Sequence, residues 1–322
     1  QMEDDKKAFQ EIEKLAEEYP MDMRYLTLLG DLYLQNGKKQ EAYSTYQKVL
    51  SIEPDNAMAM FALASYYEQT GQKELYQQQI DTLLINNQVP SETRVNVMRE
   101  FIVQAEQESK DSTRVIAMFD RMLRQDPDDD QVPMLYAQYL LSKGMEKESI
   151  PVLKQVLQID PTNTAARMTL LGSAIRKNDF QEVIGLCEPG IEANPESLEF
   201  YYYLGIAYYQ AERLDDALAI YQRALQHVTA DSKKEVVSDF YSMMGDIYHS
   251  KDKMAEAYAA YDSALVYNPS NIGALNNYAY YLSVERRELD KAEEMSFKTV
   301  KAEPKNSTYL DTYAWILFEK GN

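Results

Sequence analysis

Side chains suited to acid–base or nucleophilic chemistry are few in this sequence. The only histidines are His227 and His249, and Cys187 is the only cysteine. The sequence contains no H-E-x-x-H, C-x-x-C or G-x-S-x-G motif, and no glycine-rich phosphate loop after a strand pattern. Because catalysis needs clustered acids, bases or nucleophiles, we expect no catalytic site and no bound cofactor. The sequence does not predict an enzyme.

Alternating aspartates form the one pattern that suggests a metal. Asp126, Asp128 and Asp130 alternate like the start of a calcium-binding loop, but the sixth position is Gln131 and the twelfth is Ala137. Calcium loops of this kind require glycine and glutamate there. We therefore expect no metal site, and interpret the run as an acidic helix N-terminus, where carboxylates cap free N–H groups.

Cys187 follows an apolar run, Val183 to Leu186, and has no second cysteine with which to form an intrachain disulfide. This context favours a buried structural thiol over a reactive one.

The composition favours a helical chain without a nucleic-acid partner. Among 322 residues there are only 11 glycines and 11 prolines, and 45% of residues are hydrophobic. The net charge is −19, from 33 basic and 52 acidic residues. An acidic surface repels phosphate backbones, and no run of four lysines or arginines counters it. No apolar run reaches 18 residues, so we expect no membrane span.

An internal repeat organises the sequence. Proline closes most repeats, at Pro20, Pro54, Pro127, Pro161, Pro195, Pro269 and Pro304. Twelve residues before each of these prolines is a second marker, and two further positions, Tyr76 and Ala217, continue the series in repeats without such a proline. The full series is Ala8, Ala42, Tyr76, Val115, Ser149, Val183, Ala217, Ala257 and Ala292. Its intervals are 34, 34, 39, 34, 34, 34, 40 and 35 residues. A period near 34 residues is typical of stacked helical hairpins.

Each period contains two helical stripes. Between 198 and 229 the first stripe is Tyr201, Leu204, Gly205 and Tyr208, and the second is Ala217, Tyr221 and Ala224. The i, i+3, i+4, i+7 spacing is that of one helix face. We expect Gly or Ala where the two helix backbones approach closely, and proline where the second helix stops.

The slot residues and the period together resemble the tetratricopeptide-repeat family over essentially the whole chain. The resemblance implies an all-α fold, a right-handed α-solenoid of stacked antiparallel helix pairs. We expect about eight full repeats with a half repeat at each end of a single array. The expected parts are a second helix at 3–20, regular repeats at 22–88, an atypical repeat with an insertion at 89–127, further repeats at 128–305 and a first helix at 306–322.

Some repeats depart from the family pattern. Tyr76 occupies a slot that usually holds alanine, and the segment from about 87 to 112 carries an insertion, where we expect a local change of superhelix pitch. Pro151 and Pro189 fall inside second helices, which we expect to kink or break there. Both ends fall inside repeats without a polar cap, so we expect the natural protein to be longer on both sides.

In this family, a stripe beside the core stripe of each first helix lines a concave groove that receives peptides. At the start of the chain the stripe includes Thr27, Leu34 and Ser65. The candidate binding residues that we select from the stripe are Asp31, Phe61, Tyr202, Ile206, Tyr209, Asp246, His249, Asn276, Tyr280, Asp311 and Trp315. Each ring could instead pack against the neighbouring repeat, and for Trp315 and Phe318 we favour packing against a following helix.

One branch of the family binds acidic C-terminal tails through lysine, asparagine and arginine in these slots. Here Asp31, Asp246 and Asp311 occupy such places and only Asn276 matches, so we do not expect that function. An acidic, aromatic groove should prefer a neutral to basic segment that contains aromatic residues.

The leading function is therefore a protein–protein interaction scaffold. Two alternatives remain, namely a regulatory or targeting arm of a longer enzyme, and a carbohydrate or small-ligand module with tyrosines that stack on sugar rings.

The closing segments, 276–282 and 309–315, resemble the C-terminal repeats of bacterial cell-envelope proteins, which are often lipoproteins. That resemblance implies an envelope location with a lipid anchor upstream of Gln1; the alternative is the cytoplasm. A dimer through the uncapped face of 306–320, with Leu310, Tyr313 and Leu317, would be an artefact of truncation.

Overall fold

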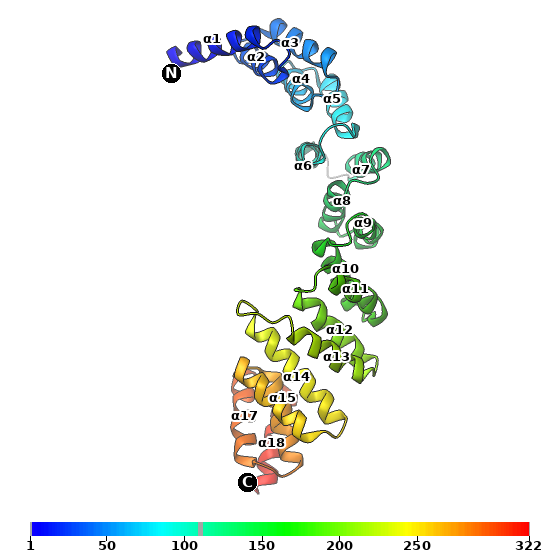
Figure 1. The fold of residues 1–322 in the computed structure, drawn as a ribbon, viewed down its shortest axis with the longest axis vertical. Helices are drawn as coiled ribbons and strands as arrows, with labels where there is room; N and C mark the ends of the chain where they lie inside the picture. The colour runs from blue at the N-terminus through cyan, green and yellow to red at the C-terminus, as the bar shows by residue number, and fades with distance from the viewer. Residues whose placement is uncertain (1, 109–111, 322) are drawn as a thin grey trace. The chain divides into compact units, whose positions relative to one another are not determined.

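The computed structural model describes residues 2–108 and 112–321, and the side chains of residues 9–107 and 112–321. The side chain of the expected marker Ala8, residues 109–111 of the expected insertion, and Asn322 lie outside the described residues. The described residues form eighteen helices and no strand (Figure 1). The predicted all-α fold of paired helices is confirmed.

Two compact units divide the chain, Gln1–Asp160 and Pro161–Asn322. The helices of unit 1 are α1 (Met2–Glu18), α2 (Met23–Gln35), α3 (Lys39–Ile52), α4 (Ala57–Gln69), α5 (Lys73–Ile85), α6 (Ser91–Glu108), α7 (Thr113–Gln125), α8 (Gln131–Ser142) and α9 (Glu146–Ile159). Here the even-numbered helices are the first helices of pairs, and the helices that follow them are the second helices.

Unit 2 continues the same alternation. Its helices are α10 (Thr164–Arg176), α11 (Phe180–Ala193), α12 (Leu198–Gln210), α13 (Leu214–Leu225), α14 (Lys234–Ser250), α15 (Met254–Tyr267), α16 (Ile272–Val284), α17 (Leu289–Ala302) and α18 (Ser307–Lys320). Within each unit, a first helix packs on the second helix that follows it, and several first helices also pack on the first helix of the next pair, as α2 does on α4 and α16 on α18 (Figure 1).

Side-chain caps and left-handed glycines set the helix ends. Asn56, Asn163 and Asn271 each precede a first helix, and their Oδ1 atoms accept hydrogen bonds from backbone N–H groups three residues on, at 2.9–3.0 Å. These caps satisfy donors that the first turn leaves free. Gly37 and Gly71, with φ of 75° and 74°, make the turn into the second helix, because a side chain is strained at such a φ.

On three first helices, a tyrosine ring from the following second helix covers a glycine of the core stripe. Tyr46, Tyr221 and Tyr261 are fully buried, and each ring lies over a glycine of the preceding helix. A Cβ atom on Gly245 would stand 2.7 Å from Tyr261 Cε1, which real Cβ atoms do not approach. Glycine is therefore required here by a side chain that crosses it. This corrects the sequence-based expectation of a direct approach between two backbones.

The expected break at proline is absent from both second helices, and the expected kink there stays a prediction. Helix α9 is continuous through Pro151, and α11 is continuous through Pro189. Proline removes one backbone N–H donor, but the backbone hydrogen bonds of the residues before and after it remain. Together with packing against neighbouring helices, they stabilise the helix. In α11, buried Arg167 adds a bond from its Nη1 to the Leu186 carbonyl at 3.1 Å, close to the proline.

The pair α6 and α7 differs from the others. Helix α6 has 18 residues, and it contacts α7 less than first and second helices contact each other in neighbouring pairs. A buried ion-pair cluster ties α6 to the turn before α8 instead. Arg94 donates to Asp126 at 2.5 Å and to Asp129 at 2.7 Å, and Asp129 also accepts from Ser91 and caps α8 through the Gln131 N–H. The acidic run thus serves a helix start, as predicted, although the capping residue is Asp129.

Candidate functional site

A cavity of about 360 Å³ lies on the first helices α2 and α4 of unit 1. We call it the unit 1 groove, and its lining residues are Thr27, Asp31, Leu34, Gln35, Met58, Phe61, Ala62, Ser65 and Gln69. The predicted stripe supplied Asp31 and Phe61, with Thr27, Leu34 and Ser65. Met58, Gln35 and Gln69 were not predicted. Each lies three or four residues along the helix from Phe61, Asp31 or Ser65, so helical spacing could have predicted all three.

Asp31 is the only ionisable side chain that lines this groove. Tyr46 crosses Gly30 from α3, and its hydroxyl donates to Asp31 Oδ1 at 2.7 Å. Burial raises the pKa of Asp31, and the hydrogen bond from Tyr46 partly offsets that rise. The carboxyl group is therefore held in a fixed position at the floor of the groove.

Apolar atoms form much of the remaining wall. Phe61 is 39% exposed and Met58 is 57% exposed, although both are large hydrophobic side chains. Exposed apolar side chains that gather around a cavity mark binding surfaces more often than single ones do. Thr27 is buried, and its hydroxyl bonds to the carbonyl of Met23 on its own helix. Gln35, Gln69 and Ser65 supply the other polar groups.

In unit 2, Asp246 repeats the position of Asp31. Tyr261 crosses Gly245 and donates to Asp246 Oδ1, and Asn277 Nδ2 donates to the same oxygen at 3.0 Å. The pKa of Asp246 is raised, because burial outweighs the opposing effects of the hydrogen bonds from Tyr261 and Asn277 and of the nearby His249. Asp246 is thus more fully hydrogen-bonded than Asp31.

The other predicted residues of α12 and α14 are half-buried and pack within unit 2. His249 stacks on Tyr281 with ring centroids 3.5 Å apart. The ring centroids of Tyr202 and of Phe240 in the next pair are 6.5 Å apart. Burial raises the pKa of the Tyr202 hydroxyl. Ile206 and Tyr209 are also half-buried. For Tyr202 and His249, contact with the neighbouring repeat is therefore part of their role.

Asn276 and Tyr280 lie on α16 with different exposures. Asn276 is only 6% exposed, and its Nδ2 donates to Asn277 Oδ1 at 3.2 Å. Its own Oδ1 is buried without a hydrogen-bond partner among the described residues. Tyr280 is 43% exposed beside Tyr281.

The last helix, α18, exposes Asp311 and Trp315. Trp315 is 40% exposed, and its ring meets Phe318 at a centroid distance of 5.8 Å. On the face that we expected to be uncapped, Leu310 is exposed, whereas Tyr313 and Leu317 are half-buried.

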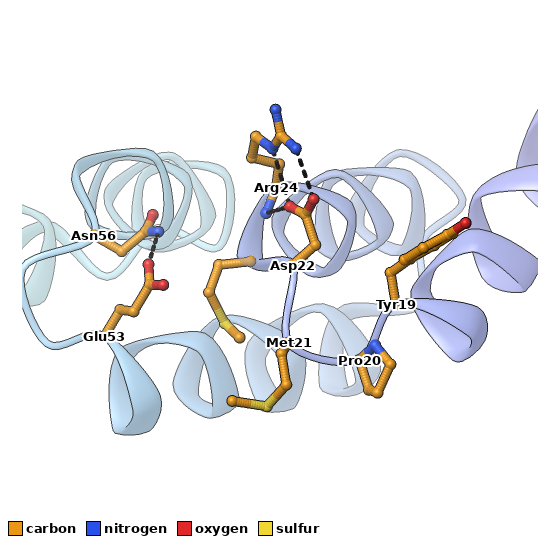
Figure 2. A pocket seen from close by; sticks show the side chains of 8 residues that line it. Tyr19, Pro20, Met21, Asp22, Arg24, Glu53 and Asn56 are labelled. Carbon is orange, nitrogen blue, oxygen red and sulfur yellow. Dashed lines mark hydrogen bonds and ion pairs between the residues drawn. The ribbon is translucent and has the colours of Figure 1, made fainter.

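A second depression, of about 470 Å³, lies at the turns before α2 and α4, and we do not regard it as a site. Figure 2 shows that its polar groups already bond to one another. Asp22 accepts from Arg24 at 2.7 Å, and Glu53 accepts from Asn56 at 2.7 Å. Met21 is exposed beside Pro20 and points away from both pairs (Figure 2).

Among the side chains of residues 9–107 and 112–321, no three from histidine, cysteine or acidic residues gather in a way that could hold a metal ion. None of the described helices is both long and apolar enough to cross a membrane.

Family models described as tetratricopeptide repeat match residues 24–56, 173–234 and 238–271. This chain contains tetratricopeptide repeats. The TPR repeat-containing protein YpiA of Bacillus subtilis (strain 168) is 26% identical over 139 residues, which are 43% of this chain and 31% of that protein. DnaJ homolog subfamily C member 3 of Gallus gallus is 24% identical over 190 residues, 55% of this chain and 37% of that protein. The chain thus spans about a third of the length of these curated relatives.

Among solved structures, the TPR protein YrrB, which is described as having an unusual peptide-binding site, aligns with 61% of this chain over 97% of its own length. The sequence identity is 18% and the TM-score is 0.47. Tetratricopeptide repeats support a general role as a protein-interaction scaffold, because stacked helix pairs present an extended surface.

Proposed function

We propose that this tetratricopeptide-repeat protein binds a peptide segment of a partner protein on the exposed faces of its first helices, without catalysis of its own. The unit 1 groove is the observation that carries this proposal. It combines a cavity, an apolar wall at Phe61 and Met58, and one fixed carboxyl group at Asp31. Such a combination suits a segment that inserts an apolar side chain and orients it by polar contacts.

In unit 2 the proposed contacts are Tyr202, Ile206, Tyr209, Asp246, His249, Asn276 and Tyr280, with Asp311 and Trp315 on α18. Support comes from the exposure of Tyr280 and Trp315 and from the unpaired Oδ1 of Asn276. A buried acceptor without a donor costs free energy, which a donor from a bound segment would recover after a small side-chain movement. The net charge of −19 favours a neutral to basic partner.

Peptide selection tests the proposal. A library of random 12-residue peptides displayed on phage is selected against the immobilised chain, and the affinities of enriched peptides are measured by calorimetry. Phe61→Ala should weaken the binding of those enriched peptides that occupy the unit 1 groove by about tenfold or more, as for an aromatic side chain that the peptide buries. Phe297→Ala is the matched control, because Phe297 is exposed on the second helix α17 outside the groove. Failure to enrich any peptide, or equal losses in both variants, contradicts the proposed function.

For the cellular location, we propose the bacterial cell envelope, with the cytoplasm as the alternative. The support is the resemblance of the closing segments to envelope proteins. Fractionation of cells that express the full-length protein decides between the two compartments.

A further inference from the structure

The carboxyl group of Asp31 is the single ionisable group among the described lining residues of the unit 1 groove, and few groups compensate its charge. Among residues with described side chains, only Tyr46 donates a hydrogen bond to it, and that bond reaches Oδ1. In the same set, no lysine, arginine or histidine lies within ion-pair distance of Asp31, and the groove lining contains no cationic residue. Asp31 lines the groove, and no described group donates a hydrogen bond to its Oδ2. A half-buried carboxylate in this state is stabilised by a cation that replaces its lost water.

The groove wall fits the stem of a long cationic side chain. Phe61, Met58 and Leu34 supply apolar surface beside Asp31, and Ser65 and Gln69 supply polar groups on α4. Lysine and arginine lay their methylene stems on apolar surface while the charged head seeks an acceptor. The exposed ring of Phe61 can also attract a cation to its face.

Asp246 offers an internal comparison within the same chain. It has the same relation to Gly245 and Tyr261, but Asn277 donates a second hydrogen bond to it. At the corresponding position of α12 stands Ile206, which has no charge. The three crossing tyrosines thus lie beside Asp31, Ile206 and Asp246, and of these three residues only Asp31 combines a charge, a cavity and a single donor.

We propose that the unit 1 groove selects a partner segment by a lysine or arginine side chain, whose cationic head pairs with Asp31 while its stem lies against Phe61 and Met58. This inference rests on the proposed peptide-binding function and adds the chemistry of the residue that is recognised. The occupant is a basic peptide segment of another protein.

The test repeats the phage selection on wild type, on Asp31→Asn and on Asp215→Asn, where Asp215 is an exposed carboxylate of α13 outside the unit 1 groove. Asparagine at position 31 keeps the shape and an acceptor for the Tyr46 hydroxyl but removes the charge, so the fold is retained. Lysine or arginine should be enriched at one peptide position with the wild type and with Asp215→Asn, and this enrichment should vanish with Asp31→Asn. Peptides selected without any lysine or arginine preference overturn the inference and leave the proposed function intact. Failure to select any peptide removes the proposed function itself.

A thermodynamic cycle makes the assignment to Asp31 specific. The best wild-type peptide is resynthesised with norleucine in place of its lysine, or of the arginine that was selected, which removes the charge and keeps an aliphatic stem. Norleucine should weaken binding to the wild type about tenfold and have little effect on Asp31→Asn. Equal losses in both proteins overturn the inference. If Asp31→Asn does not fold, the wild type alone still decides, because only the cationic peptide should lose affinity as salt is raised.

Discussion

Tyr221 of α13 lies across Gly205 of α12, so that a Cβ atom on this glycine would stand 2.6 Å from the tyrosine hydroxyl oxygen. The ring is fully buried, and its hydroxyl reaches the carbonyl of Tyr202 at 3.5 Å. The same relation joins Gly30 to Tyr46 and Gly245 to Tyr261. In each case the tyrosine passes over its own first helix and ends next to the residues that we assign to a binding surface.

Gly205→Ala should therefore destabilise unit 2 by about 1–3 kcal/mol, because the methyl group displaces a packed ring. Urea unfolding followed by circular dichroism measures the change. Gly185→Ala is the matched control. This helical glycine has no atom within 4 Å of an added Cβ, so alanine should stabilise by about 0.5–1 kcal/mol. Equal effects of the two substitutions would refute the packing explanation.

A compensating change should recover part of that loss. In the α8–α9 pair, Ala137 and Leu153 occupy the positions of Gly205 and Tyr221, and both are buried. The double variant Gly205→Ala/Tyr221→Leu should be less destabilised than the sum of the two single variants. Strict additivity, measured by the same urea titration, would show that the two sites do not share this space.

Arg94 should be critical to unit 1, although its helix pair is the least regular. Its side chain is 2% exposed and pairs with Asp126 and Asp129. Arg94→Ala leaves two carboxylates without their cation, one of them buried, and should cost about 3–5 kcal/mol of unfolding free energy. Arg24→Ala removes an exposed pair with Asp22, which water and salt screen, and should have a far smaller effect on unfolding. A cost for Arg94→Ala as small as that for Arg24→Ala would contradict the structure.

The sequence predicts the helices and the stripe that contains Asp31 and Phe61, because both follow from the 3.6-residue period and a 34-residue repeat. It does not predict the pairing of Arg94 with Asp129, since α6 departs from the repeat and the partners are 35 residues apart. It also does not separate Tyr202, which packs on Phe240, from Tyr280, which is exposed. That distinction depends on side-chain packing between repeats, which the period does not encode. The occupancy of the groove stays a prediction.

The stability contributed by Asp246 should depend on pH in the direction opposite to most carboxylates. Burial raises the pKa of Asp246 in the folded protein above its ordinary value of 3.8, so the folded state holds the proton more tightly than the unfolded state. The wild type should therefore gain stability relative to Asp246→Asn as the pH falls from neutral toward 3.8. Asp215 provides the control of opposite sign. A bond from Lys251 lowers the pKa of Asp215, so the wild type should lose stability relative to Asp215→Asn as the pH falls below 3.8. Parallel trends for the two variants would contradict this assignment.

Cys187 should be unreactive until unit 2 unfolds. Its side chain is fully buried, as the sequence predicted, and burial raises the pKa of the thiol to about 12. The thiolate is the reactive form, and a pKa near 12 leaves almost none of it at pH 8. With Ellman's reagent at pH 8, the native chain should release no thionitrobenzoate within minutes, whereas the chain in denaturing urea should release one equivalent. Gly205→Ala should shorten the native half-time of this reaction, because it loosens the neighbouring helix pair and increases transient opening. Rapid reaction in the native wild type would show that the thiol is accessible, and an unchanged rate in Gly205→Ala would show that opening around Cys187 does not involve α12.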